Sequence, residues 1–504
     1  MTAINLKDFD MFSGIMPEWS IVLDTDSYKV SMWKQYPPGT KFVSSYIEAR
    51  GGRFPNTTFF GLQAFLKKLS RRVTRQEVEF ARMFWTTHGE PFNYDGWMYI
   101  VEKLDGRLPL KIDAVDEGTV VPIHNALLRI TNTDPNCWWL PTWVETSLLR
   151  AIWYPTTVCT LSWTIKQIIL KALNETADDE KIAGLMPFRL HDFGSRGASS
   201  YETAMLGGAA HLVNFMGTDT AVGMLGAMFY YGAPMDPDAG IMPGYSIPAG
   251  EHSTITSWGR ECEVDAFSNM VDQFAGPGKI YAVVSDSYDI FKAAAELWGE
   301  LLRKKVQDMG GTLVVRPDSG DPTVVPLQII EILGEKFGYT VNSKGYKVLA
   351  DCVRVIQGDG VGLDSIQAIL DSLIAAGWSA ENIAFGMGGA LLQQPNRDTQ
   401  KWAMKASAAM VGDEWRDVFK DPITDPGKTS KKGLLGLVLE GGLGSISYRT
   451  KRIEHINPRS DLLVPRFLNG MAINLTTFDE VRARSNRFGN EIDGFKPNSD
   501  FERY

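Results

Sequence analysis

The middle of the chain alternates short apolar, β-branched runs with longer helical stretches. Four such pairs follow one another: KIYAVVSDS before YDIFKAAAELWGELLRKKV, TLVVRPDSGDP before TVVPLQIIEILGEKF, VRVIQGDG before LDSIQAILDSLIAAG, and IAFGMGG before ALLQQ. Upstream, FRLHDFGSRG precedes the helical SSYETAMLGGAAHLV, and VNFMGTD is a further candidate strand. Strands that alternate with helices of this length predict βαβ units and a parallel sheet.

Polar residues and glycines follow these predicted strands. They are Asp192 and Arg196, Asp219, Ser285 and Asp286, Arg316 and Asp318, Asp359, and the pair Gly388 and Gly389. In an α/β barrel the active site is built at the carboxyl ends of the strands, by the loops that follow them. Asp and Gly at strand ends are also common turn formers and helix caps, which accounts for each one taken singly. That alternative explains the two arginines poorly, so we expect a functional rim.

The two ends of the chain have a different pattern. Near the start, a helical DTDSYKVSMWKQYPPGT ends at Pro37 and Pro38, and KFVSSYIEAR is strand-like. LPLKIDAVDEGTVVPIHNALLRITNT is typical of antiparallel strands, and GLLGLVLEGG adds a later strand. A chain of 504 residues exceeds the usual size of one hydrophobic core. We therefore expect an α/β fold: an irregular TIM-like α/β barrel over residues 156–399, and an α+β domain from residues 1–155 together with 400–504.

Composition and charge exclude several classes of function. A net charge of −9 without a long basic run argues against a nucleic-acid surface, so anionic ligands must be held by local Arg and Lys. The N-terminal stretch has acidic residues and no apolar core, and no apolar run approaches ~18 residues. We expect neither a signal peptide nor a membrane span, and hence a cytoplasmic protein. The four cysteines are widely spaced, which is typical of neither a zinc site nor a disulfide framework.

One segment combines reactive chemistry with a break in regular structure. In SIPAGEHSTITSWGRE, Pro248 and Gly250 interrupt strand and helix, and His252 follows at the start of a predicted helix. The start of a helix offers unpaired N–H groups and a positive dipole end, so it can hold an anion. On this segment alone, His252 is more typical of a capping or loop histidine. The polar strand ends elsewhere in the chain favour a catalytic role.

Two phosphate-binding motifs are incomplete in this sequence. DPGKTSKKG has Gly427, Lys428 and Thr429, but Pro422 stands where the first glycine of a P-loop belongs, and no strand precedes it. FGMGGALL has Leu391 where the third glycine of a dinucleotide motif belongs. We therefore expect neither a P-loop nor a Rossmann site.

A different phosphate site remains, made of Arg316, Gly358, Gly388 and Gly389. Glycines let the backbone approach an oxyanion closely, and a guanidinium binds one with two hydrogen bonds. Carboxylates on the same rim would hold ribose hydroxyls or hydrated Mg²⁺, which prefers oxygen ligands and substrate phosphates.

Long polar motifs stand in a fixed order along most of the chain. They are TDSYKVSMWKQYPPGT, HDFGSRGASSYETAMLGGAAHLVNFMGTDT, SIPAGEHSTITSWG, VVSDSYDIF, RPDSGDP, RVIQGDG, IAFGMGG and FKDPITDPGKTSKKG. Together they resemble the nicotinamide phosphoribosyltransferases, of the type II phosphoribosyltransferase family. The resemblance implies transfer of the 5-phosphoribosyl group from phosphoribosyl pyrophosphate to the ring nitrogen of nicotinamide, with Mg²⁺, in NAD salvage. It also implies ATP as a co-substrate, and a homodimer whose active sites each draw on both protomers.

The resemblance implies roles for individual residues. His252 matches the histidine that ATP phosphorylates transiently, and Asp286 the acidic neighbour that orients it. A carboxylate on one imidazole nitrogen leaves the other nitrogen as the nucleophile. Asp318 completes the implied catalytic set. Phe193 matches the aromatic that stacks on the pyridine ring, and Tyr28 the partner-protomer aromatic on its other face.

Asp219 matches the residue that accepts the amide N–H of nicotinamide. A carboxylate there repels the carboxylate of nicotinate, so nicotinamide is favoured. The other implied contacts are Asp26, Arg196, Ser246, Arg316, Gly358, Asp359, Gly388 and Gly389, and, for pyrophosphate or ATP, Arg50, Arg397, Lys405 and Lys420. The chain departs from the family pattern at Met387, between Gly386 and Gly388, and at Ser195, where a larger residue is expected.

Two alternatives stay open. One is a nicotinate phosphoribosyltransferase, which a comparison of turnover with the two bases distinguishes. The other is a non-catalytic binding protein with the same fold, against which the complete set of His252 and the strand-end residues argues.

Overall fold

The computed structural model describes residues 19–424, 428–442 and 445–491. The chain forms two compact units, one of Met1–Thr160 with Asn396–Tyr504 and the other of Leu161–Pro395. The boundaries expected from the sequence followed residues 155 and 399. The N-terminal stretch used to argue against a signal peptide, and residues 425–427 of the DPGKTSKKG motif, lie outside the described residues.

The second unit is built on a parallel sheet, as the strand and helix alternation predicts. Its strands lie side by side in the order β7-β6-β13-β12-β9-β8, and every pair is parallel. They are β6 (Leu190–Asp192), β7 (Gly217–Thr218), β8 (Ile280–Val284), β9 (Thr312–Arg316), β12 (Val353–Gln357) and β13 (Ile383–Met387). Strands rich in Val and Ile suit a sheet covered on both faces.

A short segment, residues 245–250, closes this sheet into a barrel. On one side the Thr218 N–H donates to the Tyr245 carbonyl, at 2.9 Å. On the other side the Gly250 N–H donates to the Ala282 carbonyl, and the Ala282 N–H to the Pro248 carbonyl, each at 2.9 Å. This closing segment joins β7 to β8, while β13 pairs with β6. The strands therefore follow one another around the barrel in chain order, which confirms the expected TIM-like fold.

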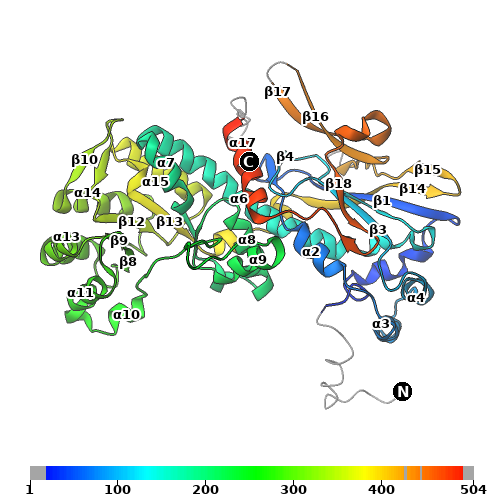
Figure 1. The fold of residues 1–504 in the computed structure, drawn as a ribbon, viewed down its shortest axis with the longest axis horizontal. Coiled ribbons are helices and arrows are strands. Elements are labelled where there is room, and N and C mark those ends of the chain that lie inside the picture. Colours follow the sequence, from blue (N-terminus) through cyan, green and yellow to red (C-terminus); the bar gives the residue numbers. More distant parts are fainter. Residues whose placement is uncertain (1–18, 425–427, 443–444, 492–504) are drawn as a thin grey trace, which may run out of the picture. The chain divides into compact units, whose positions relative to one another are not determined.

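Helices follow the strands, and α11, α13, α14 and α15 lie around the outside of the sheet (Figure 1). The helices of this unit are α7 (Asp179–Leu185), α8 (Tyr201–Leu212), α9 (Ala221–Tyr231), α10 (His252–Thr256), α11 (Glu263–Phe274), α12 (Ile290–Lys292), α13 (Arg303–Met309), α14 (Val325–Phe337), α15 (Leu363–Ala375) and α16 (Gly389–Leu392). The hairpin β10 (Tyr339–Val341) and β11 (Lys347–Leu349) follows α14. The helix expected after β8 becomes a π-helix, η7, over Ala293–Leu301.

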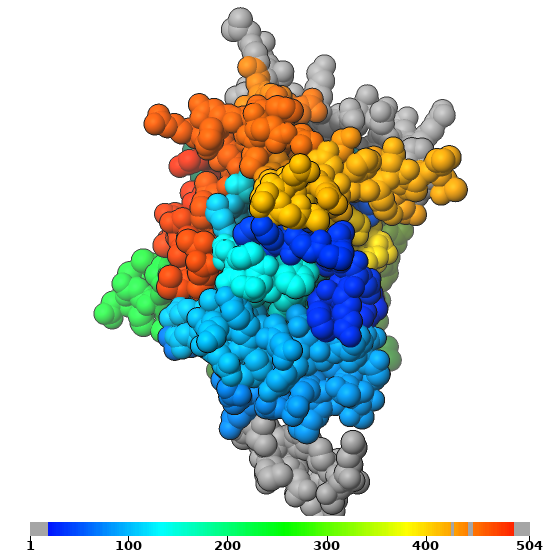
Figure 2. Space-filling model, turned by 90° about the vertical axis from the view of Figure 1, so that its right-hand side faces the viewer, coloured from blue at the N-terminus to red at the C-terminus, as the bar shows by residue number. Residues whose placement is uncertain are grey.

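The first unit is an α+β structure assembled from both ends of the chain. Its main sheet has the strand order β15-β14-β1-β5-β3-β18-β19. These strands are β1 (Thr40–Ala49), β3 (Leu110–Ala114), β5 (Leu128–Asn132), β14 (Trp402–Val411), β15 (Glu414–Asp417), β18 (Val464–Leu468) and β19 (Met471–Ala472). β1 from the N-terminal part pairs antiparallel with β14 from the C-terminal part. Figure 2 shows the mixing, with blue and cyan segments lying against yellow and orange ones.

Smaller elements complete the first unit. They are η2 (Ser27–Lys34), β2 (Asn56–Thr58), α2 (Leu62–Leu69), α3 (Arg75–His88), α4 (Tyr94–Lys103), β4 (Val120–Pro122), α5 (Leu140–Trp143), β16 (Leu435–Gly442), β17 (Ser445–Arg452) and α17 (Phe478–Glu491). Helix α6 (Glu145–Thr176) begins in this unit and ends in the other. The core contains edge-on indole contacts, such as Trp97 against Trp139 and Trp143. Within the described residues, no helix is long and apolar enough to cross a membrane.

Candidate functional site

The polar residues singled out in the sequence converge at the carboxyl edge of the barrel. Each stands at the end of a strand or just after it: Asp192 at β6, Asp219 at β7, Asp286 at β8, Arg316 at β9, Gly358 at β12 and Gly388 at β13. Because the strands are parallel, their carboxyl ends meet at one edge. Ser285 is buried, and its hydroxyl accepts a hydrogen bond from Trp298 Nε1 at 3.1 Å. It therefore faces the surrounding helices.

His252 and Asp286 form a hydrogen-bonded pair at this edge. His252 is the first residue of α10, as the sequence predicts, and its Nε2 lies 2.8 Å from Asp286 Oδ1. A carboxylate only accepts hydrogen bonds, so Nε2 carries the proton and Nδ1 keeps its lone pair when the ring is neutral. The His252 side chain is 43% exposed and that of Asp286 is 6% exposed. The partly exposed His252 ring, with Nδ1 as its available nucleophile, is thus held by a nearly buried carboxylate.

The Phe193 ring lies against two glycines, whose lack of side chains leaves room for it. A Cβ built on Gly386 would lie 1.9 Å from Phe193 Cε2, and a Cβ on Gly358 would lie 3.5 Å from the same atom. The ring packs against the interior apolar cluster of Ala282, Val314 and Ile356, and Phe193 keeps part of its surface exposed. Phe193 is therefore packed against the barrel interior while part of its surface stays exposed.

Arg316 lies between this aromatic ring and a carboxylate. Its Nε and Nη2 donate to the two Asp318 oxygens at 3.1 and 2.7 Å. The guanidinium carbon lies 5.9 Å from the centroid of the Phe193 ring, within the range of a cation–π contact. Arg316, expected on the phosphate side, thus also faces the residue expected to stack on the base.

Asp219 is exposed at the end of β7 and accepts a hydrogen bond from Ser246 Oγ in the closing segment. Asp192, one strand away, is fully buried. Its Oδ1 accepts the Gly194 N–H at 2.7 Å. Burial raises the pKa of Asp192 to about 7, hydrogen bonding from Gly194 and Thr220 opposes the rise, and the nearby Asp219 charge adds to it. The backbone joins the two residues, because the Asp219 N–H donates to the Asp192 carbonyl at 2.9 Å.

Four rim residues remain: Arg196, Asp359, Gly388 and Gly389. Gly388 caps α16, and a Cβ there would lie 3.7 Å from the Phe193 carbonyl oxygen. Gly389 and Arg196 are exposed, and a Cβ on Gly197 would lie 3.4 Å from Gly389 Cα. Asp359 is exposed, with its carbonyl accepting from Gln357 Nε2 at 2.7 Å. The small residues keep this part of the edge open.

The first unit holds a separate cluster of cations. Lys29 Nζ forms an ion pair with Glu145 at 2.6 Å. Arg50 has two buried guanidinium nitrogens, Nε and Nη1, without hydrogen-bond partners. Burial lowers the pKa of Lys405, Glu145 opposes this shift, and Arg50, Lys29 and Lys420 add to it. Such a surplus of positive charge suits an anion.

The other expected contacts of the first unit lie at its surface. Tyr28 is 61% exposed on η2. Asp26 stands just before that helix, and its Oδ2 accepts from Thr146 Oγ1 at 2.7 Å. Arg397 is exposed, and its Nη2 donates to the neighbouring Asp398 at 3.3 Å. The structure therefore leaves all three accessible.

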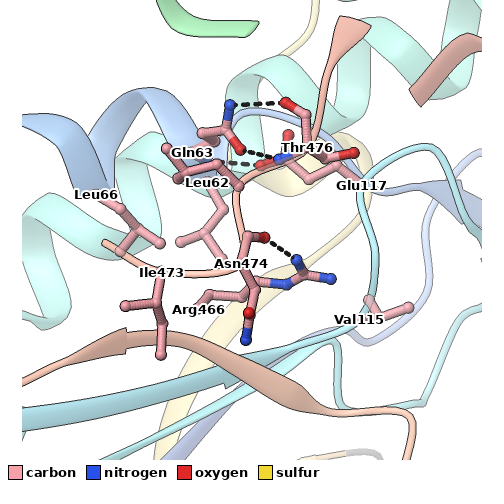
Figure 3. A pocket seen from close by; sticks show the side chains of 10 residues that line it. Leu62, Gln63, Leu66, Val115, Glu117, Arg466, Ile473, Asn474 and Thr476 are labelled. Carbon is pink, nitrogen blue, oxygen red and sulfur yellow. Dashed lines mark hydrogen bonds between the residues drawn. The ribbon is translucent and has the colours of Figure 1, made fainter. Parts of the chain in front are cut away.

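A small cavity in the first unit is unsuited to a substrate (Figure 3). It is lined by Leu62, Gln63, Leu66, Val115, Glu117, Arg466, Ile473, Asn474, Leu475 and Thr476, and its volume of about 10 Å³ holds a single water molecule. Its polar groups are paired: Gln63 exchanges hydrogen bonds with the Thr476 backbone at 3.0 and 2.8 Å. The cavity is a packing feature of the α2 region.

Three residues of the barrel edge were not singled out for the site from the sequence. Ser319 Oγ donates to Asp286 Oδ2 at 2.6 Å. Gly386 seats the Phe193 ring. Asp192 was recognised as a strand-end residue but given no role in the site. Ser319 and Gly386 lie inside quoted motifs, yet hydroxyl partners and close approaches leave no signal in spacing or composition.

Known proteins match most of the chain. The sequence pattern of the nicotinate phosphoribosyltransferase (NAPRTase) family matches residues 188–456, and that of the nicotinamide phosphoribosyltransferase N-terminal domain matches residues 20–112. The chain is 52% identical to a nicotinamide phosphoribosyltransferase of Xanthomonas campestris pv. campestris, over 92% of this chain and 98% of the relative. Proteins of the same name from Acinetobacter baylyi and Mycoplasma pneumoniae are 30% and 32% identical, over 94% and 82% of this chain and 97% and 94% of their own length.

Solved structures support the fold at low sequence identity. Nicotinate-nucleotide pyrophosphorylase from Pyrococcus furiosus superposes with a TM-score of 0.57 at 16% identity, covering 97% of each chain. Human nicotinic acid phosphoribosyltransferase superposes with a TM-score of 0.56 at 16% identity, covering 92% of this chain and 93% of the human one. With the sequence matches and the barrel edge described above, the chain belongs to the nicotinate phosphoribosyltransferase family and, within it, to the nicotinamide phosphoribosyltransferases.

Proposed function

We propose that this chain transfers the 5-phosphoribosyl group of phosphoribosyl pyrophosphate to the ring nitrogen of nicotinamide, forming nicotinamide mononucleotide and pyrophosphate for NAD salvage. The proposal is carried by Phe193, Arg316 and Asp318 at one barrel edge, in a chain 52% identical to a named nicotinamide phosphoribosyltransferase. An aromatic face, a guanidinium and a carboxylate together suit a pyridine ring joined to a phosphorylated ribose.

In this reaction the bond from the anomeric carbon to pyrophosphate breaks, and its electron pair leaves with pyrophosphate. The lone pair of the pyridine nitrogen forms the new carbon–nitrogen bond. No proton has to move, because neutral nicotinamide already exposes that lone pair. The main task of the protein is therefore to hold the nitrogen in line with the anomeric carbon, with Phe193 packing on the ring and Asp318 oriented towards ribose by Arg316.

Asp219 is proposed to select the base. Its carboxylate is exposed at the barrel edge and held by Ser246, so it can accept the amide N–H of nicotinamide. The carboxylate of nicotinate would face a like charge there, which costs several kcal/mol across a binding site. Nicotinamide is therefore the expected substrate.

ATP is proposed to phosphorylate His252. The hydrogen bond from Nε2 to Asp286 leaves the lone pair on Nδ1, which would take the γ-phosphoryl group as ADP leaves. Water later releases the group as phosphate and returns the ring to its neutral form. A carboxylate on the opposite nitrogen also stabilises the positive charge that the ring gains on phosphorylation.

The cations of the first unit are proposed to hold pyrophosphate or the ATP phosphates. The strongest candidates are Arg50, with its two unpartnered nitrogens, and the half-buried Lys405. Arg397 and Lys420 are exposed. We also propose a homodimer in which Tyr28 of one copy covers the nicotinamide bound by the other. The exposed tyrosine ring supports this role, since such rings are enriched at interfaces.

Mg²⁺ is proposed to arrive with the substrate. Among the described residues, no group of three or more His, Cys, Asp or Glu side chains is arranged as a metal cage. The oxygens of Asp286 and Asp318 already accept hydrogen bonds. A Mg²⁺ ion carried mainly by phosphates fits this donor set, and when bound it neutralises charge on the departing pyrophosphate.

One assay tests the central proposal. Purified chain is incubated with phosphoribosyl pyrophosphate, Mg²⁺ and either nicotinamide or nicotinate, with and without ATP, and the mononucleotide is measured. We expect nicotinamide mononucleotide to form faster than nicotinate mononucleotide, and ATP to raise the rate. Faster turnover of nicotinate would make the chain a nicotinate enzyme, and no turnover of either base would leave a binding protein.

A further inference from the structure

Both oxygens of the Asp286 carboxylate have partners, one on a helix and one in a loop. Oδ1 lies 2.8 Å from His252 Nε2 on α10. Oδ2 accepts a hydrogen bond of 2.6 Å from Ser319 Oγ, in the loop after β9. The Asp286 carboxylate is nearly buried, with its side chain 6% exposed, whereas Ser319 lies at the surface of the barrel edge. Asp286 therefore ties the proposed phosphoryl acceptor to the β9 loop.

The same loop carries the contacts proposed for ribose and base. Asp318 directly precedes Ser319 and holds Arg316 through two hydrogen bonds, of 3.1 and 2.7 Å. The Arg316 guanidinium lies 5.9 Å from the centroid of the Phe193 ring. His252 is thus connected through the Asp286 carboxylate and the Ser319 hydroxyl to the loop that carries Asp318.

We propose that Ser319 is a positioning residue that couples the phosphorylation of His252 to the substrate contacts of the β9 loop. This inference rests on the proposed ATP coupling. A phosphoryl group on Nδ1 makes the imidazole cationic while Nε2 stays protonated, so the bond from Nε2 to Asp286 strengthens. Ser319 binds the other oxygen of that carboxylate, and the loop bearing Asp318 is held in one position as a result.

Phosphorylation of His252 and binding of substrate are linked equilibria in this proposal. ATP changes substrate affinity only if the phosphorylated and unphosphorylated states differ in their free energy of interaction with the substrate, and the β9 loop is the route proposed for that difference. The Ser319 hydroxyl is the side-chain contact that the structure places between Asp286 and that loop. Removal of the Ser319 hydroxyl should leave the phosphorylation of His252 unchanged and reduce the effect of that phosphorylation on substrate binding. Coupling between sites in proteins is commonly about 5- to 150-fold in affinity, so the effect is measurable.

The test compares Ser319→Ala with the parent chain. The KM of phosphoribosyl pyrophosphate is measured with and without ATP, together with the acid-labile phosphate on the protein and the ATP hydrolysed per mononucleotide formed. We expect phosphoprotein formation to persist, the ATP-dependent fall in KM to shrink by about fivefold or more, and more ATP to be hydrolysed per product.

Two further variants make the test specific. Ser319→Thr keeps a hydroxyl and should retain most of the ATP effect, which a merely structural role would not require. Thr323→Val removes another hydroxyl of the same loop, one that bonds to Asp321 at 2.7 Å, and should leave the ATP effect unchanged. Ser319→Cys, of nearly the same size, replaces Ser319→Ala if the latter does not fold, and should lose the effect as well.

The outcomes separate this inference from the function on which it rests. If the parent chain responds to ATP and His252→Ala does not, but Ser319→Ala responds as the parent does, Ser319 has no coupling role. If Ser319→Ala fails to form phosphoprotein, the residue serves the phosphorylation step itself and the inference is overturned. If the parent chain neither responds to ATP nor becomes phosphorylated, the proposed ATP coupling fails and the role of Ser319 fails with it.

Discussion

The Phe193 ring occupies the space that a side chain at residue 386 would need, because a Cβ on Gly386 would lie 1.9 Å from Cε2 and 2.3 Å from Cδ2. Real Cβ atoms do not approach so closely, so any residue larger than glycine must displace the ring. Gly386 is the fourth of the five residues of β13, and glycine within a strand ordinarily weakens it. The position of the Phe193 ring therefore explains why this strand residue has no side chain.

Gly386→Ala is expected to raise the KM of nicotinamide by about tenfold or more, since displacement of a substrate-positioning group by about 1 Å has effects of that size. Steady-state kinetics with both substrates measure the change. Gly184→Ala is the matched control, because nothing lies within 4 Å of a Cβ there. Gly386→Ala combined with Phe193→Ala should be no worse than Phe193→Ala alone; additive losses would show that the glycine acts elsewhere.

Asp219→Asn is expected to relax the choice of base. The change removes the charge that repels nicotinate and keeps an oxygen for the nicotinamide amide, so the preference for nicotinamide should fall by about tenfold or more. The ratio of kcat/KM for the two bases is the measurement. Asp265→Asn removes a charge from an exposed site on α11 and serves as the control. An unchanged ratio would mean that Asp219 does not select the base.

His252→Ala is expected to abolish the stimulation by ATP while part of the ATP-independent synthesis remains, because the transfer to nicotinamide needs no imidazole. Loss of a nucleophile of this kind lowers the step it serves by far more than about tenfold. Mononucleotide formation with and without ATP, and phosphate bound to the protein, are measured. His455→Ala, at an exposed histidine of the first unit, should behave as the parent chain. ATP stimulation that survives His252→Ala would assign the phosphoryl acceptor elsewhere.

Asp192 should make stability fall as the pH rises through its titration. Burial raises its pKa from the ordinary 3.8 to about 7 in the folded chain. Between these values the native state binds a proton that the unfolded state has lost, so protonation stabilises the fold at the lower end of the window. This stabilisation by the bound proton is lost above the pKa of the folded chain. At about 1.4 kcal/mol per pKa unit, it amounts to at most about 4 kcal/mol.

Asp192→Asn cannot titrate, so urea unfolding of both chains across this window checks the assignment. The free energy of unfolding of the parent relative to the variant should decrease from about pH 4 to about pH 7 and then level off. Asp265→Asn, exposed on α11, provides the comparison for a carboxylate with no such burial. A constant difference between parent and Asp192→Asn would contradict the raised pKa.

Removal of Mg²⁺ by a chelator is expected to stop turnover without lowering the unfolding temperature of the free chain. Oxygen-rich phosphates carry the ion in this proposal, so the protein alone gains no stability from it. Thermal unfolding with and without chelator, beside the activity assay, gives the answer. A lower unfolding temperature after chelation would point to an ion held by the protein itself.

The sequence predicts the barrel and its polar edge well, because both follow from local rules. β-branched strands before helices force parallel pairing, and parallel pairing brings Asp219, Asp286 and Arg316 to one edge. The start of α10 at His252 also follows from local signals. These features depend on residue type and spacing along the chain.

Other features depend on partners that spacing does not reveal. The closing segment contains Pro248 and makes single bridges to β7 and β8, so it lacks the length and the composition of a strand. β7 itself has only the residues Gly217 and Thr218. The burial of Asp192 and the bond from Ser319 to Asp286 arise from packing between distant loops. Such contacts become visible only when the chain is folded.

The pairing of β6 with β13 has a consequence for synthesis of the chain on the ribosome. These are the first and last strands of the barrel in chain order, so β6 lacks one neighbour until the end of the barrel has been translated. Phe193 and Gly386 meet across that seam. Contacts between such distant residues form slowly, and the unpaired edge of β6 is open to wrong partners in the meantime. The contact between Phe193 and Gly386 therefore cannot form before β13, the last strand of the barrel, has been made.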